Sequence, residues 1–258
     1  MRPPVDRRRG ALARSRFVRL DEAMLQTVSA EPRRAVMTVN GARLIADRSG
    51  AAMELETRTL LVADLHFEKG SAFAARGRFL PPYDTRATIL RLADAIARLR
   101  PARVVALGDS FHDLGADGRI HVADADALAA LVRSVGDWLW IEGNHDPEPP
   151  ARFGGRIAHE ARLGPLVLRH EPQAGDRPGE VAGHLHPCAR IAVRGRALRR
   201  RCFATDGSRL VMPAFGAFTG GLNVCDPAWA PIFEARPTAW MTGDTGVFPV
   251  CGSKLRPD

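Results

Sequence analysis

The sequence predicts an α/β fold, and two patterns carry that prediction. Short apolar runs bounded by polar residues recur along the chain, which is typical of strands buried on both faces of a sheet. Amphipathic stretches of helical spacing lie between these runs, so strands and helices alternate. No internal repeat or low-complexity linker interrupts residues 57–225, so we expect one α/β domain there.

Strands are expected first. Residues 36–56 alternate apolar and polar side chains around Asn40-Gly41 and Ser49-Gly50, which predicts short antiparallel strands joined by tight turns. Each of the later apolar runs predicts a buried strand: Leu60–Ala63, Val104–Leu107, Trp138–Ile141 and Leu166–Leu168.

Two helices and a hairpin complete the expected elements. Asp84 or Thr85 can cap a helix whose apolar face carries Ile89, Leu92, Ala93, Ile96 and Leu99. Residues 125–135 form a second amphipathic candidate, and residues 191–214 predict a β-hairpin that turns at Asp206-Gly207.

Composition and charge exclude several classes of protein. With 258 residues, 45% hydrophobic and 26% charged, the chain is neither disordered nor fibrous. No apolar run approaches the roughly 20 residues of a membrane span, and no secretory signal is apparent, so we expect a cytoplasmic protein without a membrane partner. The net charge is +8, of which residues 1–34 carry +5, from nine Arg and four acidic residues.

We expect three regions: an Arg-rich, disordered tail over 1–35, the main domain over 36–235 and a C-terminal extension over 236–258. The tail can hold nucleic acid through its phosphates, or it can be only a solvated extension.

Metal-capable side chains follow five of the strand-like segments. The carboxyl ends of strands in an open α/β sheet converge on one crevice, so the five clusters are expected to meet. Taken singly, an Asp-x-His, a Gly-Asp or a strand-terminal His is weak evidence, since each also occurs in turns or packed cores. Together and in this order they predict a metal centre. The clusters are Asp64-Leu65-His66, Gly108-Asp109, Gly143-Asn144-His145-Asp146, Arg169-His170 and Gly183-His184-Leu185-His186.

This order of motifs resembles that of the calcineurin-like metallophosphoesterases, over roughly residues 57–190. The resemblance implies a four-layer α/β/β/α sandwich of two mixed sheets with a two-metal centre at the strand ends. It implies that one divalent ion is held by Asp64, His66 and His186, the other by Asn144, His170 and His184, with Asp109 bridging them.

Within the resemblance, His145 is the histidine that contacts the phosphate without binding a metal, either stabilising the transition state or protonating the leaving oxygen. Carboxylate, imidazole and amide ligands suit Mn best, with Fe or Zn as the other choices. Arg169 departs from the family pattern, in which a small residue precedes the histidine. His159 is therefore a weaker competitor for His170, and Asp146 is given only an orienting role.

Longer stretches resemble one branch of that family, the ligase-associated DNA damage response endonucleases (the PdeM family). The resemblance covers residues 59–223 and rests on stretches that include Val62–Gly70, Leu80–Thr85, Gly108–Asp113 and Pro213–Gly221. It implies a bacterial enzyme of DNA repair, encoded beside an ATP-dependent DNA ligase, a helicase and a metallo-β-lactamase-type nuclease.

A basic run follows the last ligand pair and includes Arg194, Arg196, Arg199, Arg200 and Arg201. Such a run can contact a DNA backbone near the metals, or it can be the charged edge of a solvated hairpin. We expect a metal-dependent endonuclease acting on DNA. The alternatives are a phosphatase or phosphodiesterase for small nucleotides or phosphoproteins, and a non-catalytic scaffold.

Overall fold

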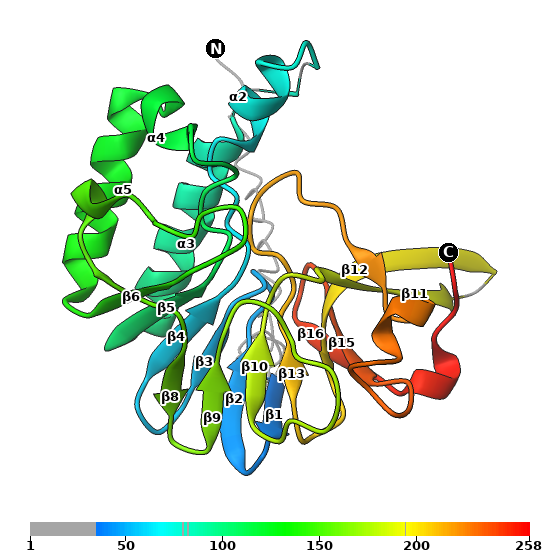
Figure 1. The fold of residues 1–258 in the computed structure, drawn as a ribbon. Helices are drawn as coiled ribbons and strands as arrows, with labels where there is room; N and C mark the ends of the chain where they lie inside the picture. The colour runs from blue at the N-terminus through cyan, green and yellow to red at the C-terminus, as the bar shows by residue number, and fades with distance from the viewer. Residues whose placement is uncertain (1–34, 79, 82, 194) are drawn as a thin grey trace, which may run out of the picture. The chain divides into compact units, whose positions relative to one another are not determined.

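The computed structural model describes residues 35–78, 80–81, 83–193 and 195–258. The expectations for residues 1–34 of the tail and for Arg194 lie outside these residues. The described chain contains two mixed sheets with a small number of helices, which confirms the predicted fold class (Figure 1).

The first sheet is antiparallel in its amino-terminal half and parallel in the rest. β1 to β4 run antiparallel, joined by the predicted turns at Asn40-Gly41 and Ser49-Gly50, and β4 to β7 run parallel. Asn40 and Gly41 have φ of 45° and 85°, as a tight hairpin turn requires. The strands are β1 (Ala35–Val39), β2 (Ala42–Ala46), β3 (Ala52–Glu54), β4 (Thr59–Val62), β5 (Arg103–Leu107), β6 (Trp138–Ile141) and β7 (Arg156–Ala158).

The helices follow the parallel strands. They are α2 (Lys69–Ala74), α3 (Asp84–Leu99), α4 (Ala116–Arg119) and α5 (Val122–Val135). Leu92 of α3 and Leu128 of α5 are fully buried in a cluster with Val62 and Val104 of the first sheet. Figure 1 shows α3 and α5 beside β4 to β6, so these helices form the outer layer of the first sheet.

The start of α3 differs from the expectation that Asp84 or Thr85 caps it. The N-cap is Tyr83, which makes no side-chain cap hydrogen bond. Asp84 instead accepts a hydrogen bond from the Gly70 N–H at 2.9 Å, and Thr85 accepts one from the Glu68 N–H at 2.8 Å. The two side chains join α3 to α2 because that helix offers unpaired N–H groups close by.

The second sheet has the order β14-β11-β12-β13-β10-β9-β8, and β15 and β16 extend it beside β12. The predicted strand at Leu166–Leu168 is present as β9. The strands are β8 (Ala161–Leu163), β9, β10 (Glu180–Ala182), β11 (Pro187–Val193), β12 (Arg196–Thr205), β13 (Leu210–Val211), β14 (Leu222–Asn223), β15 (Thr238–Thr242) and β16 (Val247–Val250).

The segment predicted as one hairpin, residues 191–214, takes part in two antiparallel strand pairs. The turn at Asp206-Gly207 is present and joins β12 to β13, but β12 also pairs antiparallel with β11, from Cys188↔Arg201 to Val193↔Arg196. Arg196, Arg199, Arg200 and Arg201 therefore lie on one strand, β12. Alternation puts Arg199 and Arg201 on one face of that strand and Arg196 and Arg200 on the other.

Apolar side chains fill the space between the two sheets. Leu61 and Val105 of the first sheet cluster with Leu168 and Val181 of the second, and all four are at most 1% exposed. The outer face of the second sheet is covered by a 3-10 turn at Pro227–Trp229 and by Leu255 near the C-terminus. Residues 236–258, the expected C-terminal extension, contribute β15 and β16 to the sheet.

No helix in the described part of the chain is long and apolar enough to cross a membrane.

Candidate metal centre

The structure brings together the seven residues that the sequence predicts as metal ligands. Asp64 and His66 follow β4, Asp109 follows β5 and Asn144 follows β6 of the first sheet. From the second sheet, His170 follows β9, and His184 and His186 lie between β10 and β11. Both sheets therefore supply ligands to one place.

One group consists of Asp64, His66 and His186. Their ligand atoms all lie within 4.8 Å of one another. His186 Nε2 is 3.3 Å from Asp64 Oδ1 and 3.3 Å from His66 Nε2. Asp64 and His66 are buried and His186 is partly exposed, so the group opens to solvent on one side.

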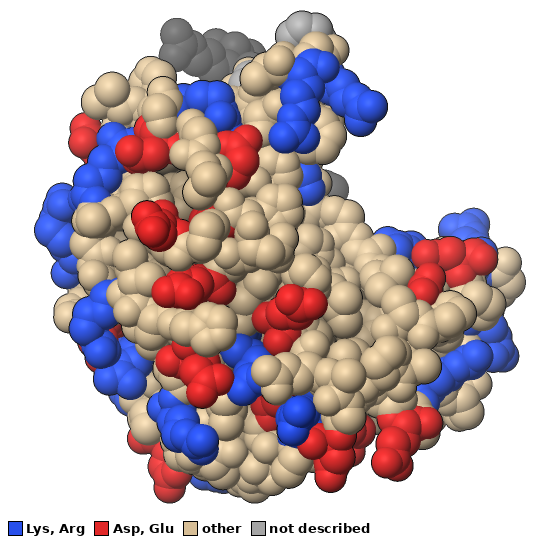
Figure 2. Space-filling view, viewed as in Figure 1, with Lys and Arg blue, Asp and Glu red and all other residues tan. Residues whose placement is uncertain are grey.

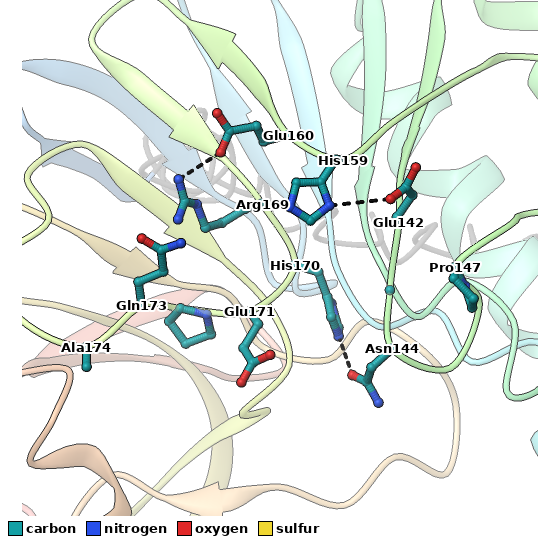
Figure 3. Close-up of a pocket in the computed structure, with 12 residues that line it drawn as sticks. Glu142, Asn144, Pro147, His159, Glu160, Arg169, His170, Glu171, Gln173 and Ala174 are labelled. Atoms are coloured by element: carbon teal, nitrogen blue, oxygen red, sulfur yellow. Dashed lines mark hydrogen bonds and ion pairs between the residues drawn. The ribbon is translucent and has the colours of Figure 1, made fainter.

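The second group consists of Asp109, His170 and His184, with Asn144 beside it. The ligand atoms of Asp109, His170 and His184 also lie within 4.8 Å of one another. Asn144 Oδ1 is 2.9 Å from His170 Nε2 and 3.0 Å from His184 Nδ1, as shown for His170 in Figure 3. Asp109 Oδ1 is 3.3 Å from His170 Nε2, and its Oδ2 is 4.0 Å from His66 Nε2. The Asp109 carboxylate thus faces both groups.

The donor atoms fit divalent ions. Protein ligands lie about 2.0–2.2 Å from such an ion, so two ligands at right angles are about 3 Å apart. Within each group, the neighbouring ligand atoms named above are 2.9–3.3 Å apart. Leu107 O accepts a hydrogen bond from His170 Nδ1 at 3.0 Å, so Nε2 is the ring nitrogen of His170 that can bind an ion.

Unusual backbone conformations concentrate at this site. Positive φ values are uncommon for residues other than glycine and cost free energy, so they indicate that the surrounding structure imposes them. The ligands with positive φ are Asp64 (54°), His66 (45°), Asp109 (48°), His184 (68°) and His186 (48°). Each side chain is therefore turned to the centre by a backbone shape that ordinary strand or helix geometry does not provide.

The glycines of the motifs make room for the ligands. A Cβ on Gly108 would come within 2.4 Å of the His170 ring, and one on Gly143 would lie 2.1 Å from the backbone nitrogen of Asp109. Real Cβ atoms essentially never come closer than 3.0 Å to such neighbours. The chain can therefore pack β5, β6 and β9 this closely only with glycine at these two positions.

The charges of the centre are strongly coupled. Burial lowers the pKa of His66 to about 2, so this imidazole is neutral, as a metal ligand must be. Burial would raise the pKa of Asp109, but the hydrogen bond from His170 and the charges nearby outweigh it and lower the pKa to about 2. Burial likewise opposes the charge on His170, yet its hydrogen bond to Asp109 raises the pKa to about 9. The Asp109 carboxylate is thus ionised.

His145 lies at the edge of the centre. Its backbone N–H donates to Asp109 Oδ1 at 2.9 Å, and its Nδ1 lies 2.8 Å from the carbonyl oxygen of His112. That carbonyl can only accept, so Nδ1 carries the proton and Nε2 remains for another partner. Nε2 is 3.9 Å from Asp109 Oδ2, and the side chain is 40% exposed. His145 is placed to touch a group bound at the metals.

His112 and Lys69 also lie beside the centre, although neither was predicted as a site residue; both belong to the stretches that carry the resemblance. The His112 ring stacks on His145, with centroids 5.2 Å apart, and meets the edge of His66 at 5.4 Å. Burial, together with the charges of His145 and Lys69, lowers the pKa of His112 to about 4. Its position three residues after Asp109 was the available signal.

Asp146 supports the loop that carries the centre. Its Oδ2 accepts hydrogen bonds from the Ser110 and Phe111 N–H groups at 2.9 and 3.0 Å. Burial and the nearby Asp109 raise the pKa of Asp146 to about 7. It ties the loop after β6 to the loop after β5, in keeping with the orienting role expected for it.

The predicted basic run divides into two kinds of residue. Arg196, Arg199 and Arg200 are exposed, and Arg199 pairs with Asp258 at 3.0 Å. Arg201 is half-buried and donates to the carbonyl oxygens of Ala214 and Gly216 at 2.9 Å each. Its guanidinium therefore holds the loop beside Asp64 in place. His159, the weaker competitor for His170, lies on the surface beside Glu142.

A comparison with protein families matches residues 57–195 to the calcineurin-like phosphoesterases. The chain belongs to this family. It is therefore a hydrolase of phosphoester bonds that uses divalent metal ions, and the two groups described above are where the described residues can hold them.

Solved structures add one close relative. A nuclease named MPE from Pseudomonas putida is 31% identical to this chain, with a TM-score of 0.65 over 84% of this chain and 100% of its own. A phosphoesterase of E. coli, Yfce, is 14% identical to this chain, with a TM-score of 0.40 over 75% of this chain and 98% of its own. A comparison with curated proteins gave no match.

Proposed function

We propose that this metal-dependent phosphoesterase is an endonuclease that cleaves phosphodiester bonds of DNA. The observation that carries the proposal is the pair of ligand groups facing Asp109, with His145 at their edge, in a chain that spans the whole length of a nuclease 31% identical to it. The same centre in this family could serve other phosphoesters, so the substrate is the part that needs an experiment.

Two divalent ions in these groups would polarise the phosphate oxygens and supply a nucleophilic water at neutral pH. The chain's own part is to place the phosphate beside His145. Because Nδ1 of His145 is bound to a carbonyl, a protonated ring can donate only from Nε2, to a phosphate oxygen or to the leaving oxygen. The stacked His112 ring and its carbonyl hold His145 in that orientation.

The donor set favours manganese in this proposal. The two groups combine carboxylate oxygen, amide oxygen and imidazole nitrogen, and none of their members is a cysteine. Such mixed hard and intermediate ligands suit Mn, while Fe and Zn remain the alternatives to be compared.

DNA is the proposed substrate because one basic side chain lies beside the centre and others are exposed on β12. Lys69 is close enough to His66 and His112 to lower the pKa of each. Arg196 and Arg200 are exposed on β12 and can contact phosphates further along a strand. Following the family resemblance, we place the enzyme in bacterial cytoplasmic DNA repair, with an ATP-dependent ligase, a helicase and a second nuclease as partners.

An activity panel tests the substrate. The protein loaded with Mn is offered a phosphomonoester, bis(p-nitrophenyl) phosphate, a 2′,3′-cyclic nucleotide and supercoiled plasmid. Nicking of the plasmid together with hydrolysis of the diester, both lost with a chelator, is the expected result. Hydrolysis of the monoester or the cyclic nucleotide alone would favour a phosphatase or a small-nucleotide phosphodiesterase.

Two arginine variants separate binding from structure. Arg200→Gln, with Arg196→Gln, should weaken plasmid cleavage and reduce the log–log salt slope by about 0.9 for each lost duplex contact, while the small diester is cleaved as before. Arg201→Gln should lower both activities, because it releases the loop beside Asp64. Unchanged plasmid cleavage in the first variant would remove this strand from the proposed DNA surface.

A further inference from the structure

A pocket of about 610 Å³ opens directly beside the second ligand group. Its wall includes Asn144 and His170 of the centre, and it extends from there between the loop at Pro147 and the loop at Gln173 (Figure 3). This volume lies within the roughly 300–1,000 Å³ of typical small-ligand sites. Whatever is bound at the metals has this space next to it.

The pocket is acidic. Three carboxylates line it, those of Glu142, Glu160 and Glu171, against the single guanidinium of Arg169. Arg169 is bound to Glu160 at 2.8 Å, so Glu160 is neutralised. Glu142 and Glu171 remain, and Figure 3 shows them on either side of the His170–Asn144 pair. The Glu142 carboxylate lies 3.4 Å from the exposed ring of His159.

The opposite end of the centre has the opposite charge. Lys69 Nζ lies 6.0 Å from the centre of the Phe73 ring, and that ring lies 5.8 Å from the His112 ring, whereas Glu171 lines the pocket beside His170. Figure 2 likewise shows acidic side chains across the middle of the displayed face and basic ones over α2, with both kinds together at the β11–β12 hairpin. Phosphates that flank the reacting one are attracted to the basic end and repelled from the pocket.

We propose that this pocket holds the base of a nucleotide whose phosphate lies at the metal centre, and that it favours bases carrying an amino group. The inference rests on the proposed function and names the part of the substrate that the pocket reads. A carboxylate can only accept hydrogen bonds, and cytosine, adenine and guanine each offer an exocyclic NH₂. Thymine offers a carbonyl oxygen at the corresponding position, which Glu142 and Glu171 would repel.

The lining also suits a planar, polar guest better than a simple cation. Pro147 and Pro172 supply apolar surface, and the Gln173 side chain can both donate and accept.

The test uses the 5′- and 3′-(p-nitrophenyl phosphate) diesters of deoxycytidine and thymidine, with bis(p-nitrophenyl) phosphate as a base-free reference. Wild-type protein should cleave the deoxycytidine ester of one linkage with a kcat/KM roughly tenfold above that of its thymidine counterpart. In the double variant Glu142→Gln with Glu171→Gln this ratio should fall to about one, because a glutamine amide can donate to thymine O4. Glu148→Gln, an exposed glutamate outside the pocket, should keep the wild-type ratio.

A second readout does not depend on catalysis. Ligand-observed NMR should detect binding of deoxycytidine, which has no phosphate, more strongly than thymidine, and this difference should vanish in the double variant. Equal handling of the two bases by wild-type protein, or a ratio unchanged in the double variant, would overturn the pocket assignment. If bis(p-nitrophenyl) phosphate is not hydrolysed at all, the proposed function fails, and the nucleoside binding still decides the pocket.

Discussion

At the scale of single residues, His145 separates chemistry from metal binding. Its ring faces solvent at the edge of the centre, and its hydrogen bond to a ligand, Asp109, comes from its backbone N–H. His145→Ala should therefore lower kcat for bis(p-nitrophenyl) phosphate by about 10²–10⁴-fold while both ions remain bound. Metal content of the purified variant is the deciding measurement, and loss of both ions would contradict this role.

Two further variants are compared with His145→Ala in that experiment. Asp109→Asn should empty or weaken both sites, because the carboxylate faces both groups. Its full metal occupancy would count against the bridging position. His121→Asn is the matched control, since His121 is exposed and caps α5, a task that asparagine performs as well.

A glycine supplies a second prediction at this scale. In Gly143→Ala the new methyl group would collide with the backbone nitrogen and carboxylate of Asp109, neither of which can move without displacing a ligand. We expect loss of metal binding, measured by titration with Mn, and a lower melting temperature. Gly118→Ala is the control, because nothing lies within 4 Å of its Cβ position. Normal metal affinity in Gly143→Ala would show that the Asp109 loop adapts.

At the scale of elements, a buried carboxylate joins the β2–β3 turn to α3. Arg98 donates two hydrogen bonds to Asp47, at 2.8 and 3.1 Å, and one to the exposed Asp94. Burial would raise the pKa of Asp47, but the hydrogen bonds from Arg98 and Ser49 outweigh it and lower the pKa. Asp47 therefore stabilises the fold above the unfolded-state pKa of about 3.9, and that contribution disappears as the pH falls through the folded-state value.

Asp47→Asn should accordingly reduce the free energy of unfolding by about 1–2 kcal/mol at pH 7. The difference from wild type, measured by urea unfolding, should shrink as the pH approaches 3.5. Asp94→Asn removes the solvent-exposed partner of the same arginine and should have little effect. A pH-independent difference in Asp47→Asn would mean that the change acts through packing instead of charge.

The elements also show what could be predicted from sequence. The strands that carry the ligands were predictable because the ligands follow short buried runs directly, as Asp64 and His66 follow β4. The structural role of Arg201 was not predictable, because its partners are carbonyl oxygens of a loop more than ten residues away. No sequence pattern links that loop to β12. The role of Asp84 was also not predictable. It was expected to cap its own helix, α3, but it binds the N–H group of Gly70 in another helix, α2.

At the scale of the whole domain, each ligand group takes residues from both sheets. Asp64 and His66 come from the first sheet and His186 from the second, and Asp109 meets His170 and His184 in the same way. The sheets already share an apolar layer, but at this end charged and polar side chains face each other. Ions bound here would hold the two sheets together.

Metal loading should therefore stabilise the fold and not only activate it. Mn at a hundredfold excess over its Kd adds about 2.7 kcal/mol for one site, which corresponds to a melting temperature roughly 5–10 °C higher than in chelator. His145→Ala should keep this rise, because it leaves every ligand in place, whereas Asp109→Asn should lose most of it. A full rise in Asp109→Asn would show that the ions bind without linking the two sheets through this carboxylate. A rise of zero in wild-type protein would show that the folded protein binds Mn no more tightly than the unfolded chain does.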